Sequence, residues 1–164
     1  MRLGFWSGAT AAVAAAVALA SAASAQSVAI RGPAGQSSAV TQADLAALPR
    51  QSVTLAGEHG PARRYEGVAL TSLLERVGAP VGKALRGPAM ADIVVIAASD
   101  GYRVALGLGE TDPGVRPEKV ILADKVDGGP LDANEGPFRL VVEGDLRPAR
   151  AARQVTSITV EAAP

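Results

Sequence analysis

The sequence predicts an α+β fold with a mixed, mostly antiparallel sheet and short helices. Strand-like runs outnumber helical ones, giving about six or seven strands against two or three helices. The runs are joined mostly by tight turns, which suit antiparallel neighbours and leave no room for repeated crossover helices. Helical patterns are confined to the front half of the chain. These three observations exclude a doubly wound parallel sheet.

The first 25 residues have the pattern of a secretory signal peptide. Arg2 precedes an alanine-rich apolar stretch over 3–20, and Ala23-Ser24-Ala25 fits the small-x-small cleavage rule. An uncleaved membrane anchor is the alternative, although alanine partitions only weakly into hydrocarbon. We expect cleavage, a periplasmic or secreted protein with no membrane span afterwards, and one globular domain over 26–164.

Two short helices are expected before residue 80. Thr41 is a suitable N-cap, and Asp44 stands where it can bond back to the cap. The clearest helical pattern is an apolar face at spacings i, i+3, i+4 and i+7, followed by a glycine suited to the C′ position. This face consists of Leu70, Leu73, Leu74 and Val77, before Gly78. A further short helix over 81–85 is weakly indicated.

The expected strands fall at the two ends and through the second half of the chain. Asp100-Gly101 and Asp127-Gly128 are turn dipeptides between them. The continuous apolar runs 93–97 and 120–123 predict central strands buried on both faces. The remaining strands are expected over 52–55, 63–65, 102–105, 138–142 and 155–160, and 26–30 is a further possible strand.

The amino-acid composition excludes several kinds of partner and of catalytic site. The chain has 16 basic and 16 acidic residues, so nothing favours nucleic acid or an anionic membrane as a partner. It contains no cysteine, which excludes disulfides, thiolate metal ligands and thiol nucleophiles from this chain. Dinucleotide, phosphate-loop and nucleophile-elbow motifs are absent. The single histidine, His59, leaves an exported hydrolase as a remote alternative.

Arginines are the remaining candidates. Arg139 interrupts an apolar strand and should share a face with Val141. A solvated face is the favoured reading, and an anion-binding guanidinium is the alternative. Arg147, Arg150 and Arg153 form a basic cluster that is either a solvated surface or a local anion site.

Five stretches in register resemble the molybdopterin-binding domain of the sulfite oxidase family. They are Tyr65 to Leu70 with the leucines and glycine that follow, Ser99 to Tyr102, Leu122 to Leu131, Gly136 to Val142, and Arg153 to Val160. Each alone is weak, but their order and spacing agree over about residues 50–160. The chain thus looks like a small, stand-alone exported member of that family.

The resemblance implies an α+β fold with a cleft that holds a pterin-bound molybdenum. In that reading Arg139 and Arg153 hold anionic groups of the cofactor, and Asp100 and Tyr102 line the cleft. Family enzymes bind the metal through a cysteine ahead of the Gly67-Val68 segment, where this chain has Val53-Thr54-Leu55-Ala56-Gly57. Metal ligation by this chain is therefore not expected, unless a partner subunit supplies the thiolate.

Two functions follow from these expectations. The first is a molybdopterin-dependent oxidoreductase domain, in which the cofactor supplies the chemistry. The second is a cofactor-free periplasmic module that keeps the fold without the metal site and binds a small anion or a partner. The catalytic residues and the substrate are not indicated by the sequence.

Overall fold

The computed structural model describes residues 26–56 and 60–163, so the predicted leader and His59 lie outside the described residues. Ten strands form two sheets in the described part of the chain. The pairing is antiparallel throughout except between β1 and β10. The α+β class with a mostly antiparallel sheet is therefore confirmed.

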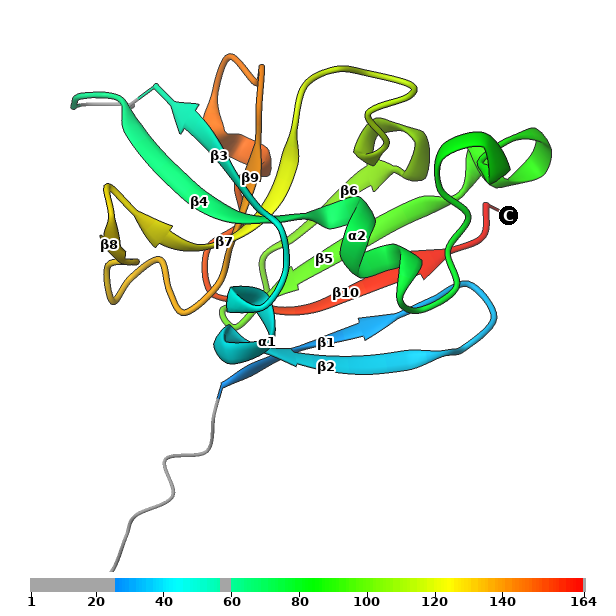
Figure 1. Ribbon diagram of the computed structural model, residues 1–164, viewed down its shortest axis with the longest axis horizontal. Coiled ribbons are helices and arrows are strands. Elements are labelled where there is room, and N and C mark those ends of the chain that lie inside the picture. Colours follow the sequence, from blue (N-terminus) through cyan, green and yellow to red (C-terminus); the bar gives the residue numbers. More distant parts are fainter. Residues whose placement is uncertain (1–25, 57–59, 164) are drawn as a thin grey trace, which may run out of the picture.

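The first sheet has the strand order β2-β1-β10-β5-β6. It occupies the right and lower part of Figure 1. Its strands are β1 (Ser27–Arg31), β2 (Ser37–Thr41), β5 (Ile93–Ala98), β6 (Arg103–Gly107) and β10 (Val155–Glu161).

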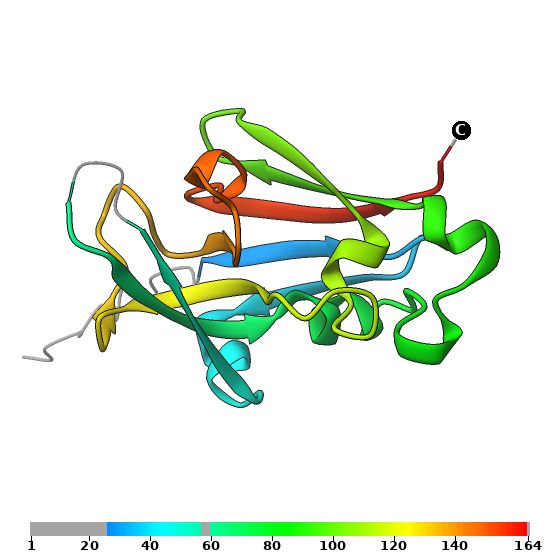
Figure 2. The ribbon, with the colours of Figure 1, turned by 90° about the horizontal axis from the view of Figure 1, so that it is seen from above.

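The second sheet has the order β3-β4-β7-β8, with β9 paired to β7, and lies at the left of Figure 1. Figure 2 draws β7 and β10 in separate layers. The strands are β3 (Arg50–Leu55), β4 (Arg63–Ala69), β7 (Val120–Val126), β8 (Gly129–Pro130) and β9 (Arg139–Val142).

Both predicted helices form where their caps and apolar faces place them. Helix α1 (Gln42–Ala46) has Thr41 as its N-cap. The Thr41 hydroxyl accepts a hydrogen bond from the Asp44 amide at 3.2 Å, and the Asp44 carboxylate accepts one from the Thr41 amide at 2.8 Å. Helix α2 (Leu70–Glu75) buries its leucines. Residues 26–56 and 60–163 also contain four short 3-10 helices: η1 (Gly82–Ala84), η2 (Gly87–Ala91), η3 (Leu108–Thr111) and η4 (Pro148–Arg150).

The main hydrophobic core joins the first sheet, α2 and one face of the second sheet. A smaller core covers the other face of the second sheet, so β7 and β9 are buried on both sides. The prediction for 120–123 is therefore confirmed. For 93–97 the central position is confirmed, since β5 lies between β10 and β6. Burial of both faces is wrong there, because alternate residues of β5 are only partly buried.

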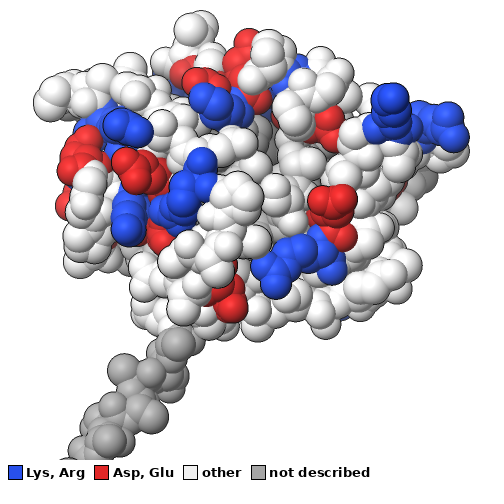
Figure 3. Space-filling view, viewed as in Figure 1, with Lys and Arg blue, Asp and Glu red and all other residues white. Residues whose placement is uncertain are grey.

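The surface agrees with a chain of zero net charge. On the face seen in Figure 3, acidic and basic side chains lie next to one another in several separate clusters. No helix in the described part of the chain combines the length and apolar character needed to cross a bilayer.

Candidate functional site

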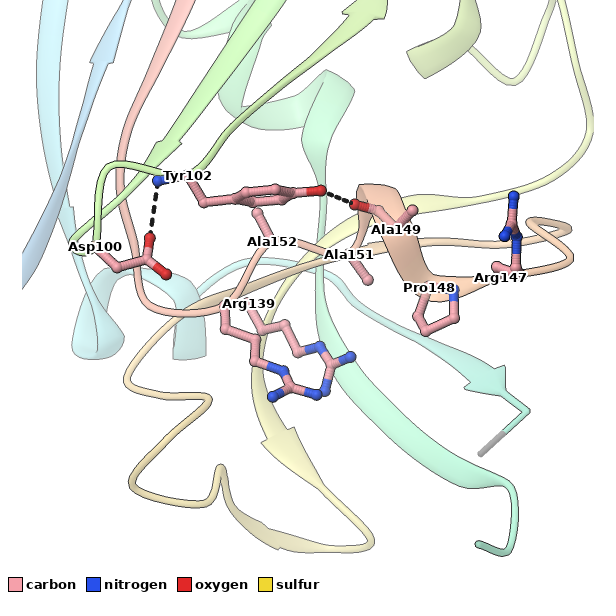
Figure 4. A pocket seen from close by; sticks show the side chains of 9 residues that line it. Asp100, Tyr102, Arg139, Arg147, Pro148, Ala149, Ala151 and Ala152 are labelled. Atoms are coloured by element: carbon pink, nitrogen blue, oxygen red, sulfur yellow. Dashed lines mark hydrogen bonds between the residues drawn. The ribbon is translucent and has the colours of Figure 1, made fainter. Parts of the chain in front are cut away.

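The four residues predicted as cofactor-binding meet at one pocket of about 380 Å³. The pocket lies between the β5–β6 turn and the loop that follows β9 (Figure 4). That these residues bind a cofactor stays a prediction, but the structure brings all four together. The pocket is lined by Asp100, Tyr102, Arg139, Arg147, Pro148, Ala149, Ala151, Ala152 and Arg153.

The β5–β6 turn holds one end of the pocket. Gly101 adopts a positive φ of 87°, as the Asp-Gly pair predicts, and the Asp100 carboxylate accepts from the Tyr102 amide at 2.9 Å. The Tyr102 hydroxyl donates to the carbonyl of Ala149 at 2.7 Å, which ties this turn to η4. The backbone turn thus sets the direction of both predicted side chains.

The fold separates the three arginines of the basic cluster, Arg147, Arg150 and Arg153, into two groups with different surroundings. Arg150 is not in the pocket: it binds Asp145 at 2.6 Å and Glu110 at 3.0 Å. The hydrogen bonds that Arg150 donates to Asp145 raise the pKa of Arg150 further above its usual range. Arg150 therefore anchors the loop, while Arg147 and Arg153 line the pocket and form no ion pair with the described residues.

Arg139 is buried, so the expectation of a solvated face is wrong. Its register prediction holds, because Val141 joins the smaller core while Leu140 joins the main one. The Arg139 side chain is only 5% exposed, because the face of β9 that carries it is covered by the smaller core. A buried guanidinium needs a counter-charge, and Glu135 supplies it.

Arg139 forms a polar cluster with Glu135 and Tyr65, and of these three residues only Arg139 lines this pocket. Arg139 Nη1 donates to the Tyr65 hydroxyl at 2.6 Å and binds the Glu135 carboxylate, and its guanidinium carbon lies 4.6 Å from the centre of the Tyr65 ring. Burial raises the pKa of the Tyr65 phenol, with the charge of Arg139 acting in the opposite direction. The phenol thus stays protonated and lies 3.3 Å from both Glu135 oxygens, close enough to donate.

The Arg139 guanidinium still has one unused donor. Its Nε is buried and has no hydrogen-bond partner among the described residues. Such an orphaned donor is unusual in a folded protein, where buried polar groups are nearly always paired. A second pocket of about 310 Å³ shares Arg139, Pro148 and Arg153 with the first and is also lined by Tyr65 and Glu135.

Sequence reasoning missed Glu135 and placed Arg147 only in the general basic cluster. The available signal for Glu135 was the strand arginine itself, because an arginine between buried positions requires an acid nearby. Glu135 lies four residues before Arg139 in the chain. No sequence pattern could have singled out Arg147, because only the path of the loop after β9 decides which of Arg147, Arg150 and Arg153 line the pocket.

The site fits an anionic group better than a thiolate-bound metal. Arg147 and Arg153 offer two unpaired guanidinium groups at one pocket. The segment in the place of the family cysteine starts within β3, where Val53 and Leu55 are buried in the smaller core. The described residues contain no group of three or more acidic or histidine side chains arranged to hold a metal ion.

Comparisons with known proteins bear on the fold alone. No family model matches the sequence, and no curated protein matches it. Among solved structures, the chain is similar to the crystal structure of the sulfane dehydrogenase SoxCD from Paracoccus pantotrophus, with a TM-score of 0.61 and 20% identical residues. The match covers 83% of this chain and 38% of that one. The chain thus has the fold of one part of a dehydrogenase.

Proposed function

We propose that this chain is an exported binding module for a small anionic ligand, built on a sulfite-oxidase-type molybdopterin domain fold. The observation that carries the proposal is the pair Arg147 and Arg153, which line one pocket without an ion-pair partner among the described residues. Beneath them, Arg139 has its charge balanced by Glu135 and keeps an unused Nε donor. Guanidinium groups suit phosphate and sulfate-like groups, which accept two parallel hydrogen bonds.

The expected affinity is modest and depends on salt. Arg147 and Arg153 are both exposed, so their charges are screened at physiological ionic strength. Hydrogen bonds to charged groups contribute roughly 1.5–3 kcal/mol each, so loss of one arginine lowers affinity by about tenfold or more.

The test is calorimetric titration of the exported protein with inorganic phosphate at low salt. We expect binding that weakens as salt is raised, and at least tenfold weaker binding in the variant that combines Arg147→Ala with Arg153→Ala. Arg86→Ala is the matched control, because Arg86 is exposed and lies outside the pocket. Equal affinity of the double variant and the control would remove the basis of the proposal.

A molybdopterin-dependent oxidoreductase is the second candidate. The motif resemblance and the likeness to a structure named as a dehydrogenase favour it. A bound pterin cofactor would supply the redox chemistry, and Arg147 and Arg153 would hold its phosphate group. The chain itself contains no cysteine, so the thiolate would have to come from a partner subunit.

Metal and pterin content decides between the two candidates. The full chain is expressed in a host that makes and exports the cofactor, and the purified protein is assayed for molybdenum, tungsten and fluorescent pterin oxidation products. We expect neither metal nor pterin at stoichiometric levels, and an N-terminus at Gln26 after removal of the leader. Stoichiometric pterin and metal would replace the binding module by the oxidoreductase.

A further inference from the structure

A glutamine is the first residue that remains when the predicted leader is removed. Cleavage after Ala25 would leave Gln26 at the amino terminus. Gln26 is exposed and lies directly before β1, which begins at Ser27. The backbone is held from Ser27 onward, because β1 lies between β2 and β10 and pairs with both (Figure 1). Gln26 therefore stands just ahead of the sheet, where its own atoms are not part of a strand.

An amino-terminal glutamine carries a nucleophile and an electrophile in one residue. Its α-amine can attack the carbon of its own side-chain amide and close a five-membered lactam. Such a reaction is intramolecular, so no second molecule has to be ordered. Every atom of the ring belongs to Gln26, and the pairing of β1 stays intact while the ring closes.

The surroundings of Gln26 favour the uncharged form of this terminus. Gln26 lines a pocket of about 270 Å³, and the nine described residues that line it include no charged side chain. An acid beside the amine would favour the ammonium form, which is not a nucleophile. Two polar side chains of the pocket are already bonded elsewhere: Ser99 donates to the Gln154 side chain at 2.8 Å, and the Gln154 amide donates to the Ala133 carbonyl at 3.1 Å.

We propose that Gln26 of the exported chain is converted to pyroglutamate. This inference rests on the export that the proposed function includes. The bond from the α-nitrogen to the side-chain amide carbon forms, and the bond from that carbon to the amide nitrogen breaks. The amide nitrogen leaves as ammonia with a proton from the amine. The product has lost the terminal positive charge. It also lacks the free amine that aminopeptidases need, so β1 is protected from trimming.

The test is a peptide map of the exported protein. The full chain is expressed in an exporting host, purified, kept at neutral pH and digested with trypsin. We expect the amino-terminal peptide Gln26–Arg31 to be lighter by the mass of one ammonia molecule. Pyroglutamyl aminopeptidase should remove its first residue and leave a peptide that begins at Ser27.

An internal glutamine and a substitution provide the controls. Gln36 is also exposed, but it has no free amine, so it should keep its side-chain amide in the same digest. Gln26→Ala removes the electrophile and keeps the amine. We expect this variant to show an open amino terminus at residue 26, which Edman degradation reads without enzyme treatment.

The outcomes separate this inference from the function on which it rests. A terminus at Gln26 that keeps its amide, or a peptide that pyroglutamyl aminopeptidase leaves unchanged, would overturn the lactam and leave export in place. A chain that retains its leader, or begins at another residue, would overturn both the lactam and cleavage after Ala25. Phosphate binding is measured separately, so its loss would overturn only the anion site.

Discussion

Replacing Gly67 by alanine is expected to unfold the protein or to lower its free energy of unfolding by about 4 kcal/mol or more. Gly67 is buried in β4, where the strand pairs with β7 beside a register shift. A Cβ atom there would lie 2.1 Å from the carbonyl oxygen of Leu122 and 2.6 Å from the Cα of Ala123. Both atoms are backbone in a central strand, so neither can move aside without breaking the pairing of β4 and β7.

Urea denaturation followed by far-UV circular dichroism measures this loss. Gly60→Ala is the matched control, because a Cβ at Gly60 has no heavy atom within 4 Å, and its effect should stay within about 0.5 kcal/mol. A Gly67→Ala variant as stable as the Gly60→Ala variant would show that β4 and β7 do not approach as closely as described.

Arg139→Ala is expected to lower the free energy of unfolding by about 3–5 kcal/mol. The substitution removes the close ion-pair partner of the Glu135 carboxylate, which is only 8% exposed and keeps just the longer contact with Arg63 at 3.9 Å. It also removes the donor that serves the Tyr65 hydroxyl. The weakened pairing of this buried charge is the larger part of the loss, because desolvation of a carboxylate is expensive when no close counter-charge offsets it.

A rescue variant distinguishes two causes of the lost stability, the buried charge of Glu135 and the loss of packing around Arg139. In a chain that combines Arg139→Met, Glu135→Leu and Tyr65→Phe, no polar side chain of the cluster remains, and we expect most of the stability to return. Arg64→Ala is the surface control: its ion pair with Glu66 spans 3.8 Å, its side chain is 63% exposed, and its removal should change stability by less than about 1 kcal/mol. A triple variant no more stable than Arg139→Ala would assign the loss to packing.

Local patterns were sufficient where a residue's role depends on its near neighbours in the chain. The apolar spacing from Leu70 predicted α2, because one helical face repeats every 3.6 residues. Asp127-Gly128 predicted the β7–β8 turn, and both residues adopt the positive φ that such a turn requires, 51° and 83°. In contrast, β2 was missed because its Ser-Ser-Ala-Val-Thr segment has little apolar alternation, and it is a strand because β1 pairs with it.

By itself, the sequence determined the α+β class, the main turns and helices, and the lack of any thiolate ligand, and its family resemblance named four of the nine residues that line one pocket. The tertiary structure alone decided that Arg139 is buried against Glu135, that Arg150 anchors a loop, and that Arg147 and Arg153 line the pocket without an ion pair to the described residues. The physical reason is the distance along the chain over which each kind of interaction acts. Helix and turn propensities act over a few residues, whereas the burial and charge partners of an arginine depend on strands and loops far away in the chain.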